Sequence, residues 1–527
     1  MSFRLFHSKL TPLSLAITLA MTGTVSAQQE SGSAEDKAKN KLETIVVTGT
    51  RNLERSLFDT LAPVDVFSEE ELAQSASSEL VDKLTTLAPS FNVQRLPMSD
   101  GLVFVRPATL RGLSPDHTLV LINGKRRHRS ALLGSRGAQG ADLAQIPAAA
   151  IKRIEVLRDG AAAQYGSDAI AGVINIILTD VEGVSGYTQA GKYFDGDGAE
   201  LQTALKIGTK IGQEGFITAT AEYTDADPTS RSRQRADAIA FEQQTGIKVQ
   251  NPVQRWGQPE LNTVRLALNS EIALNQSWLY AFATYGEGEG DSDFNWRNPL
   301  NTSAYNSSPI AYPDYDLHKI YPAGFSPVFS QEDKDLSLVT GIKGEITDDL
   351  LWDISASFGQ NQINHYLSNT INASMGSESP TDFYLGRLQQ TEANFNLDFV
   401  YAWENALLAY PANIAFGIES RKETYEIKTG ETASYLVGPA AAEGLPSGAN
   451  GFPGYGPDQA GKYDQQSYAA YIDTELALTE QFSAGMAVRY EDYSEFGNTL
   501  DGKVSLRLAL AENFALRGTV STGFRAP

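Results

Sequence analysis

From Val184 onward the chain repeats one pattern, in which apolar and polar residues alternate over one segment after another. In one such segment Leu205 and Ile207 fall on one face, and Gln202 and Lys206 fall on the other. A period of two is typical of a β-strand. A sheet with one apolar and one polar face suits a transmembrane barrel, which has lipid outside and a polar lumen inside. About thirteen such strands fit before the end of the chain.

The connections between these segments are short and long in turn. The short ones are polar turns at 213–214, 275–276, 347–349, 479–481 and 511–513. The long ones lie at 224–259, 287–333, 360–391 and 424–464. Outer-membrane barrels have short periplasmic turns and longer extracellular loops. The order of the connections therefore predicts an antiparallel transmembrane barrel rather than a soluble sandwich.

The first residues predict export. Arg4 and Lys9 precede an apolar run over 10–25, and a small-residue cleavage site ends at Ala27, so residues 1–27 are typical of a cleavable signal peptide. An uncleaved anchor fits less well, because the run is short and has no basic stop after it. The chain has no cysteine, which excludes disulfides and thiolate metal sites. Its formal net charge of −22 argues against a nucleic-acid partner.

No apolar run of roughly 18 residues follows the signal, so a membrane form of this chain must cross as a closed barrel. A soluble acidic periplasmic protein would fit the composition equally, and only the strand pattern separates the two. Before the strands, residues 28–52 form a polar, flexible lead that holds an extended β-branched segment at 43–49. Residues 53–180 then predict a compact α+β domain.

Local signals support that domain. Ser68 precedes three glutamates, which is typical of a capped helix start, and an apolar helical stripe ends before Pro89. A strand over 118–122 runs into the tight-turn pair Asn123-Gly124. Residues 173–178 are apolar on both faces, so this strand must be buried on both.

The string YGSDAIAGVINI at 165–176 closely resembles the end of the plug domain in TonB-dependent outer-membrane receptors of the siderophore and cobalamin type. LRGL at 110–113 and LING at 121–124 match the family's plug core in the same order, and the segment at 43–49 resembles the TonB box. The resemblance implies a mostly β protein, with an N-terminal α+β plug at 53–180 inside a transmembrane antiparallel barrel that begins at 184. The family barrel has 22 strands, so with about 13 present we expect a partial barrel whose C-terminal part is missing.

The resemblance also implies a function. The expected activity is active uptake of a scarce large nutrient across the outer membrane of a Gram-negative bacterium, with a ferric siderophore as the commonest ligand. Cobalamin, an oligosaccharide or a peptide stays open, as do a passive porin-like barrel and, as a third class, a periplasmic enzyme. The expected partners are TonB, acting with ExbB and ExbD, and outer-membrane lipid. The receptor is expected to be monomeric, to hold no cofactor and to bind no nucleic acid.

TonB would pull the extended segment by adding it as a strand to its own sheet. The residues of this segment are Glu43, Thr44, Ile45, Val46, Val47 and Thr48. The alternative is an ordinary first strand of the plug.

A basic run follows the Asn123-Gly124 turn. By resemblance its loop reaches the ligand, and its candidate anion-binding residues are Arg126, Arg127, His128, Arg129 and Arg136. The alternative is that they pair with carboxylates of the lumen wall, such as Glu271 or Glu475. Arg111 and Arg158 lie within the plug motifs, and the resemblance implies that they dock the plug onto the barrel.

Catalysis has little support. The five histidines lack HExxH spacing, and neither a Gly-x-Ser-x-Gly elbow nor a Walker loop is present, so no enzyme is expected. The glycine-rich string 286–290 is interpreted as a flexible loop base. Eight aromatic residues in 294–329 either wall a ligand or pack the loop against itself. Acidic residues at 195–200 and 291–293 have calcium-like spacing, but acidic turns are common and no metal site is assigned.

Overall fold

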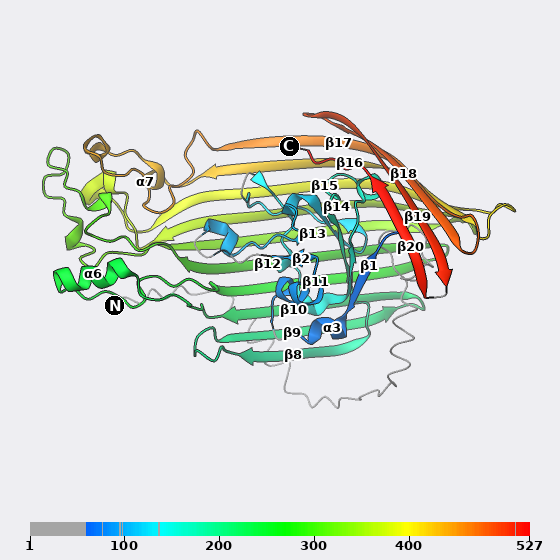
Figure 1. The fold of residues 1–527 in the computed structure, drawn as a ribbon, viewed down its shortest axis with the longest axis horizontal. Helices are drawn as coiled ribbons and strands as arrows, with labels where there is room; N and C mark the ends of the chain where they lie inside the picture. Colours follow the sequence, from blue (N-terminus) through cyan, green and yellow to red (C-terminus); the bar gives the residue numbers. More distant parts are fainter. Residues whose placement is uncertain are drawn as a thin grey trace.

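The computed structural model describes residues 60–526, except residues 76, 94–95, 97–98, 135–136 and 512. The predicted signal peptide and the predicted TonB box lie outside the described residues, and so does Arg136. The described chain forms a plug domain followed by one large antiparallel sheet, which curves around the plug (Figure 1).

The plug is built on a five-stranded sheet with the order β1-β6-β7-β4-β5. Its strands are β1 (Val64–Ser68), β4 (Thr118–Ile122), β5 (Lys125–Arg126), β6 (Ile151–Leu157) and β7 (Gly172–Leu178), and the short pair β2 (Phe91–Asn92) and β3 (Thr109–Leu110) stands apart. The helices are α3 (Glu69–Ala73), α4 (Leu80–Leu87) and α5 (Ala162–Tyr165), with 3-10 turns η1 (Asp100–Val103), η2 (Pro115–His117), η4 (Leu143–Gln145) and η5 (Ala148–Ala150).

Several local predictions for the plug are confirmed. Ser68 caps α3 in a capping box, since its side chain accepts from the Glu71 amide and the Glu71 side chain accepts from the Ser68 amide. Strand β7 lies between β6 and β4, pairing antiparallel with the first and parallel with the second. Ile174 and Ile176 are fully buried there, as an apolar strand with two covered faces requires.

Thirteen antiparallel strands follow in sequence order, which confirms the expected number. They are β8 (Gly183–Gly191), β9 (Glu200–Ile211), β10 (Gly215–Ala226), β11 (Glu260–Leu274), β12 (Ser277–Asp293), β13 (Val328–Thr347), β14 (Leu350–Ser368), β15 (Phe383–Trp403), β16 (Ala412–Thr429), β17 (Gly461–Ala477), β18 (Phe482–Tyr493), β19 (Gly497–Ala511) and β20 (Phe514–Ser521). The connections alternate between short turns and long loops, as predicted, and α6 (Ala236–Thr245) and α7 (Thr432–Tyr435) lie in two of the long loops.

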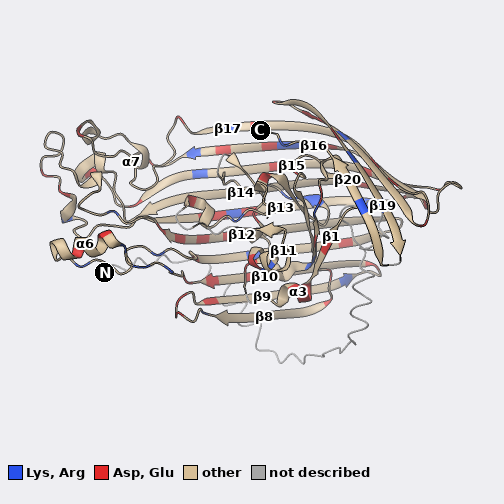
Figure 2. Cartoon of the chain, viewed as in Figure 1, with Lys and Arg blue, Asp and Glu red and all other residues tan. Residues whose placement is uncertain are grey.

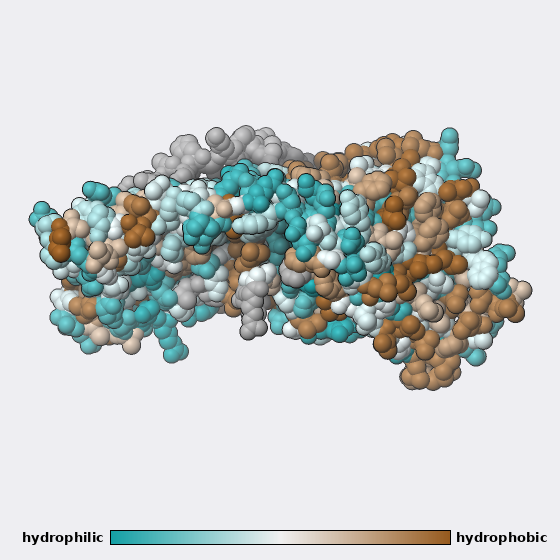
Figure 3. Space-filling model, turned by 90° about the horizontal axis from the view of Figure 1, so that it is seen from above, coloured by the Kyte–Doolittle hydropathy of each residue, from teal (hydrophilic) through white to brown (hydrophobic). Residues whose placement is uncertain are grey.

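The two faces of the large sheet differ in chemistry. Its outer face exposes large apolar side chains, among them Leu268, Phe358, Ile418 and Leu506. From above, apolar surface gathers over β17–β20, while the loop end of the molecule is mostly hydrophilic (Figure 3). Charged residues form bands along the strands around the plug (Figure 2). This division is what lipid outside and a polar lumen inside require.

Within residues 60–526 as described, no helix is long and apolar enough to span a membrane.

The interpretation of 286–290 as a loop base is wrong, because these residues lie inside β12 and keep its register with β13. Two of their glycines, Gly286 and Gly290, lie close to side chains of the plug. A Cβ on Gly286 would lie 2.3 Å from Gln145 Oε1, and one on Gly290 would lie 2.8 Å from Phe104 Cε1. The glycines therefore serve close contact between barrel and plug rather than flexibility.

Gly172 at the start of β7 should tolerate no side chain. Its φ is +150°, and an added Cβ would lie 2.2 Å from the Leu157 carbonyl oxygen. We expect Gly172→Ala to destabilise the plug by about 2–4 kcal/mol. Pulse proteolysis with trypsin in urea measures this loss. Gly191→Ala is the matched control, because nothing lies within 4 Å of its Cβ position, and an equal loss in both variants would contradict the expectation.

Candidate functional site

The basic run at 125–129 enters the interface between plug and barrel. Strand β5 returns antiparallel to β4 through Asn123 and Gly124, whose φ values of +47° and +79° form the predicted tight turn. The turn directs the next side chains toward the inner faces of β13–β16. Lys125 Nζ lies 3.0 Å from Asp353 Oδ1 and 3.4 Å from Asp398 Oδ2.

The next basic side chains are buried against the same wall. Arg127 pairs with Asp335 on β13, and His128 Nε2 lies 2.9 Å from the other oxygen of that carboxylate. Both side chains are at most 3% exposed. The ring of His128 lies against Gly359 of strand β14. A Cβ at position 359 would lie 2.2 Å from His128 Nδ1, so only glycine leaves room for the ring. The position of His128 is therefore set both by its ion pair with Asp335 and by the space beside Gly359.

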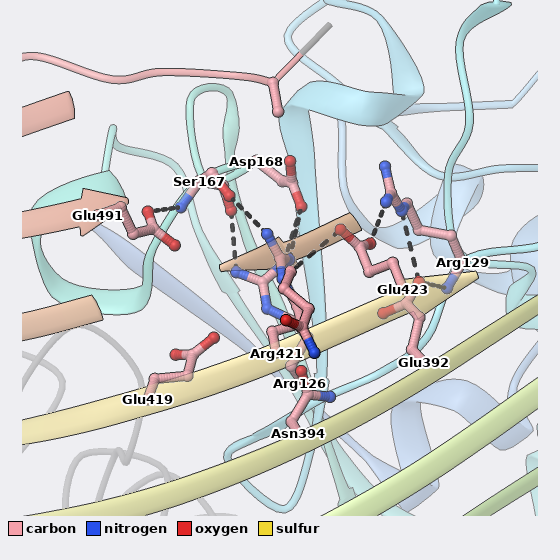
Figure 4. Close-up of polar contacts among 12 residues, drawn as sticks. Arg126, Arg129, Ser167, Asp168, Glu392, Asn394, Glu419, Arg421, Glu423 and Glu491 are labelled. Carbon is pink, nitrogen blue, oxygen red and sulfur yellow. Dashed lines mark hydrogen bonds and ion pairs between the residues drawn. The ribbon is translucent and has the colours of Figure 1, made fainter. Parts of the chain in front are cut away.

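Arg129 joins two neighbouring strands. Its side chain forms ion pairs with Glu392 of β15 and Glu423 of β16, and its backbone amide donates to Glu392 Oε1 at 2.9 Å (Figure 4). Although burial acts in the opposite direction, these carboxylates raise the pKa of Arg129, which keeps the guanidinium charged.

Asp168, from the motif at 165–176, is the centre of the plug side. Arg126 Nη1 lies 2.8 Å from its Oδ2, Arg525 Nε lies 3.3 Å from its Oδ1, and Arg421 of β16 approaches to 3.7 Å. Burial alone would raise the pKa of Asp168, but Arg126, Arg525 and Arg421 hold it well below its usual range. The three arginines therefore favour the ionised form of Asp168 between plug and barrel.

A second arginine of the wall completes the network. Arg489 of β18 lies 3.0 Å from Glu419 and 3.2 Å from Glu491. The Ser167 amide donates to Glu491 Oε2 at 3.2 Å. Gly166 has a φ of +96°, and a Cβ there would lie 2.9 Å from Arg489 Nη2. The motif therefore needs glycine at 166 for both its turn and its contact with arginine.

These contacts hold the plug against the large sheet through paired charges. A buried ion is stable only when it is paired and hydrogen-bonded, so each charge of this network requires its partner. Among the described residues, no group of three His, Asp or Glu side chains is placed to hold a metal ion. Asp197 and Asp293, from the acidic stretches of calcium-like spacing, instead pair with Arg231 and Arg255.

Comparison with known families agrees with this architecture. Residues 56–173 match the TonB-dependent receptor plug domain, and residues 275–527 match the TonB-dependent receptor-like β-barrel. Together the two matches cover more than half of the chain. The chain belongs to the TonB-dependent receptor family.

Individual relatives have related functions. The chain is 31% identical over 269 residues to the vitamin B12 transporter BtuB of Photobacterium profundum, covering 50% of this chain and 38% of BtuB. It is 24% identical over 565 residues to the probable TonB-dependent siderophore receptor PirA of Acinetobacter baumannii, covering 100% of this chain and 65% of PirA. The chain therefore spans less than two thirds of the length of these relatives.

Solved structures share the fold. The siderophore receptor PirA from Acinetobacter baumannii has a TM-score of 0.59 at 17% identity, over 94% of this chain and 63% of PirA. A mutant of the ferric enterobactin receptor PfeA from Pseudomonas aeruginosa, in complex with enterobactin, has a TM-score of 0.58 at 14% identity, over 88% of this chain and 63% of PfeA.

The predicted site residues of this receptor chain fall into three groups. Arg127, His128 and Arg129 form ion pairs with carboxylates of the large sheet, which agrees with the alternative of lumen-wall pairing, whereas Arg126 pairs with Asp168 of the plug itself. The role of these residues toward a ligand stays a prediction. The partners differ from the two carboxylates named from the sequence, since Glu271 pairs with Lys343 instead. Arg136 and the predicted TonB-box residues lie outside the described residues.

The remaining two arginines contact the plug itself. Arg158 Nε lies 2.9 Å from Asp65, and Arg111 Nη1 donates to the Arg158 carbonyl oxygen at 3.1 Å. Within the described part of the chain, neither forms an ion pair with a strand of the large sheet. Their predicted docking role therefore has no contact to support it there and stays a prediction.

The members of the network that were missed from the sequence include Asp168, Arg421, Arg489 and Arg525. One signal could have indicated two of them. Glu419, Arg421 and Glu423 recur at every second position of one strand, and Arg489 and Glu491 do so on another, so each set shares the inner face. Adjacent charges of opposite sign on a lumen face indicate an ion network.

The long outer loops pack against each other. Phe294, Trp296, Tyr315 and Phe325 are each less than a tenth exposed, and residues of the loops after β12, β14 and β16 share one apolar cluster. Glu443 links two of these loops by accepting hydrogen bonds from Ser308, Ile310 and Ala311. The ring pairs Tyr305–Phe325 and Tyr321–Phe325 agree with the alternative in which the loop packs against itself, and the shared cluster adds contacts with two other loops.

Asp168→Asn should weaken the docking of the plug strongly. It leaves the buried Arg421 and the half-buried Arg126 and Arg525 without their shared anion, and breaking a buried pair costs about 3–5 kcal/mol. The matched control is Asp180→Asn, which breaks the exposed pair with Lys152 and should cost less than about 1 kcal/mol. Pulse proteolysis of the plug in urea measures the loss of stability in both variants.

The sign of the pH dependence follows from the lowered pKa of Asp168. Asp168 contributes fully to the stability of the docked plug above the ordinary carboxyl pKa of about 4. This contribution is lost only as the pH falls through the lowered pKa of Asp168. The difference between wild type and Asp168→Asn should therefore persist at pH 4. Equal stability of the two variants at pH 7 would contradict the role of Asp168.

Proposed function

We propose that this chain carries out TonB-dependent active uptake of a scarce large nutrient, a ferric siderophore, across the outer membrane of a Gram-negative bacterium. In this proposal the full receptor is longer than this chain. Further strands join the thirteen described ones and close the barrel around the plug. The observation that carries it is the docking of the plug inside the sheet through polar and ionic contacts.

Such an interface suits a plug that must move. Arg129, Arg127 and Asp168 make their contacts through charged groups, and water entering the lumen can solvate these groups once the contacts open. A wholly apolar interface of the same size would expose apolar surface to water at each opening, at about 25 cal/mol per Å². The ionic interface therefore holds the plug firmly and still permits its displacement.

The proposed energy source is a partner. TonB, with ExbB and ExbD in the inner membrane, would add residues 43–48 to its own sheet and pull them toward the periplasm. Pulling is transmitted along the chain to the plug, so this mechanism requires neither a nucleotide site nor a cofactor in the receptor. The receptor is proposed to act as a monomer in outer-membrane lipid.

The siderophore assignment draws on PirA and PfeA, whose names and titles give siderophores as ligands. The similarity to BtuB supports cobalamin as a second candidate. Oligosaccharide or peptide uptake and a passive barrel are further outcomes that the same experiment separates, because fold alone does not determine the ligand.

The test uses the full-length receptor expressed in a host that lacks its own siderophore and cobalamin receptors. Growth and uptake are measured on ferric siderophores, cobalamin, oligosaccharides and peptides, with wild type and Ile45→Pro. Proline removes a backbone donor that strand addition needs, so we expect uptake to fall at least tenfold while surface binding remains.

Ala34→Pro serves as the matched control, because it places proline in the same lead outside the predicted TonB box. Uptake of cobalamin alone would replace the siderophore by the second candidate. Uptake that is equal in wild type and Ile45→Pro would overturn the energised mechanism and favour a passive barrel.

A further inference from the structure

At one point between plug and barrel, an amide side chain bridges a carboxylate of each. Asp142 caps the turn η4 of the plug, where its Oδ1 accepts from the Ala144 amide at 3.0 Å. Gln145 Nε2 donates to Asp142 Oδ2 at 3.1 Å and to Asp333 Oδ2 of β13 at 2.7 Å. A single amide group therefore bridges two carboxylates across the interface.

The neighbouring cations are already engaged by other carboxylates. Arg265 of β11 pairs with Glu222 of β10. Arg127 and His128 pair with Asp335, which lies two residues along the same strand as Asp333. Among the residues that the structure describes, no Lys, Arg or His forms an ion pair with Asp142 or Asp333. The pair thus differs from every other charged contact described above between plug and barrel.

The surroundings hold the pair close. Asp142 is only 4% exposed. The inner face of β12 has glycine at both facing positions, since a Cβ on Gly286 would lie 2.3 Å from Gln145 Oε1 and one on Gly288 would lie 3.2 Å from Asp333 Oδ1. Asp142 is buried and Asp333 is half-buried, and two carboxylates that are bridged by one amide resist simultaneous ionisation.

We propose that Asp142 and Asp333 form a proton-dependent latch, which holds residues 142–145 of the plug against β13 when one carboxyl is protonated and loosens when both are ionised. The role of the latch in uptake rests on the proposed function. When the latch is loosened, residues 142–145 are the place at which a plug pulled by its partner first separates from β13.

The direction of the pH dependence of the latch follows from the burial of Asp142. Burial raises the pKa of Asp142, against the opposite effect of the hydrogen bonds from Gln145 and Ala144. A group whose pKa is raised in the docked state stabilises docking below its ordinary pKa, and this contribution is lost as the pH rises through the raised value. The latch is therefore closed in acid and weakened toward neutral pH, which is opposite to the behaviour of Asp168.

Hydrogen–deuterium exchange of the purified receptor in detergent tests the latch without ligand or TonB. Exchange of peptides that cover residues 138–150 is followed at pH 5.5 and pH 8.0, corrected for intrinsic exchange, with EDTA present to exclude divalent cations. We expect protection in wild type to be at least tenfold lower at pH 8.0. Asp333→Asn, which keeps the shape and removes one charge, leaves Asp142 without its acidic neighbour and should show a smaller change of protection with pH than wild type.

Two further variants separate the latch from general destabilisation. Asp348→Asn lies in the exposed turn after β13 and should behave as wild type. Gly286→Ala displaces Gln145 and should lower protection equally at both pH values. Protection in wild type that does not change with pH, or an unchanged pH dependence in Asp333→Asn, would overturn the latch. These exchange results do not depend on whether the receptor takes up a nutrient. A failed uptake experiment would therefore leave the exchange measurement valid.

Discussion

Charges taken out of water between two domains must find partners, and this requirement organises the interface between plug and barrel. Arg127 and Asp168 are buried at that interface and Arg129 is half-buried there, so a lone ion at these positions would be too costly to retain. Their partners come from β13, β15 and β16, so the position of the plug is set by the register of the large sheet. A shift of one residue along any of these strands would turn the partner carboxylate toward lipid.

The shape of the wall follows from the same contacts. Where plug side chains press on the sheet, the strand has glycine, as at Gly286 beside Gln145 and Gly359 beside His128. Glycine is otherwise unfavourable inside a strand, so its use here marks close approach. The interface combines close fit with charge pairing, which specifies one docked position and keeps the contacts polar enough to open.

Much of the fold could be predicted from the sequence, because the deciding signals are local. Alternation with period two indicated thirteen strands, and the apolar string at 173–178 indicated a doubly covered strand. The pairings could not be predicted in the same way. Arg129 and Glu423 are 294 residues apart, and nothing local shows which lumen carboxylate will face which arginine.

Two further features depended on tertiary contacts. The string at 286–290 has the composition of a flexible loop, and only its strand neighbours keep it extended. The aromatic residues of the outer loops suited either a ligand wall or mutual packing, and that choice depends on loops distant in sequence that meet only in the folded protein.

Pulling on the full-length receptor in a supported bilayer tests the central claim most directly. A force probe attached ahead of residue 43 would load the plug as TonB is proposed to do. The account predicts that the first event lengthens the chain by about 400 Å, which corresponds to roughly 120 plug residues at ~3.4 Å each, while the barrel stays in the bilayer. Stepwise loss of barrel strands before the plug is released would contradict it.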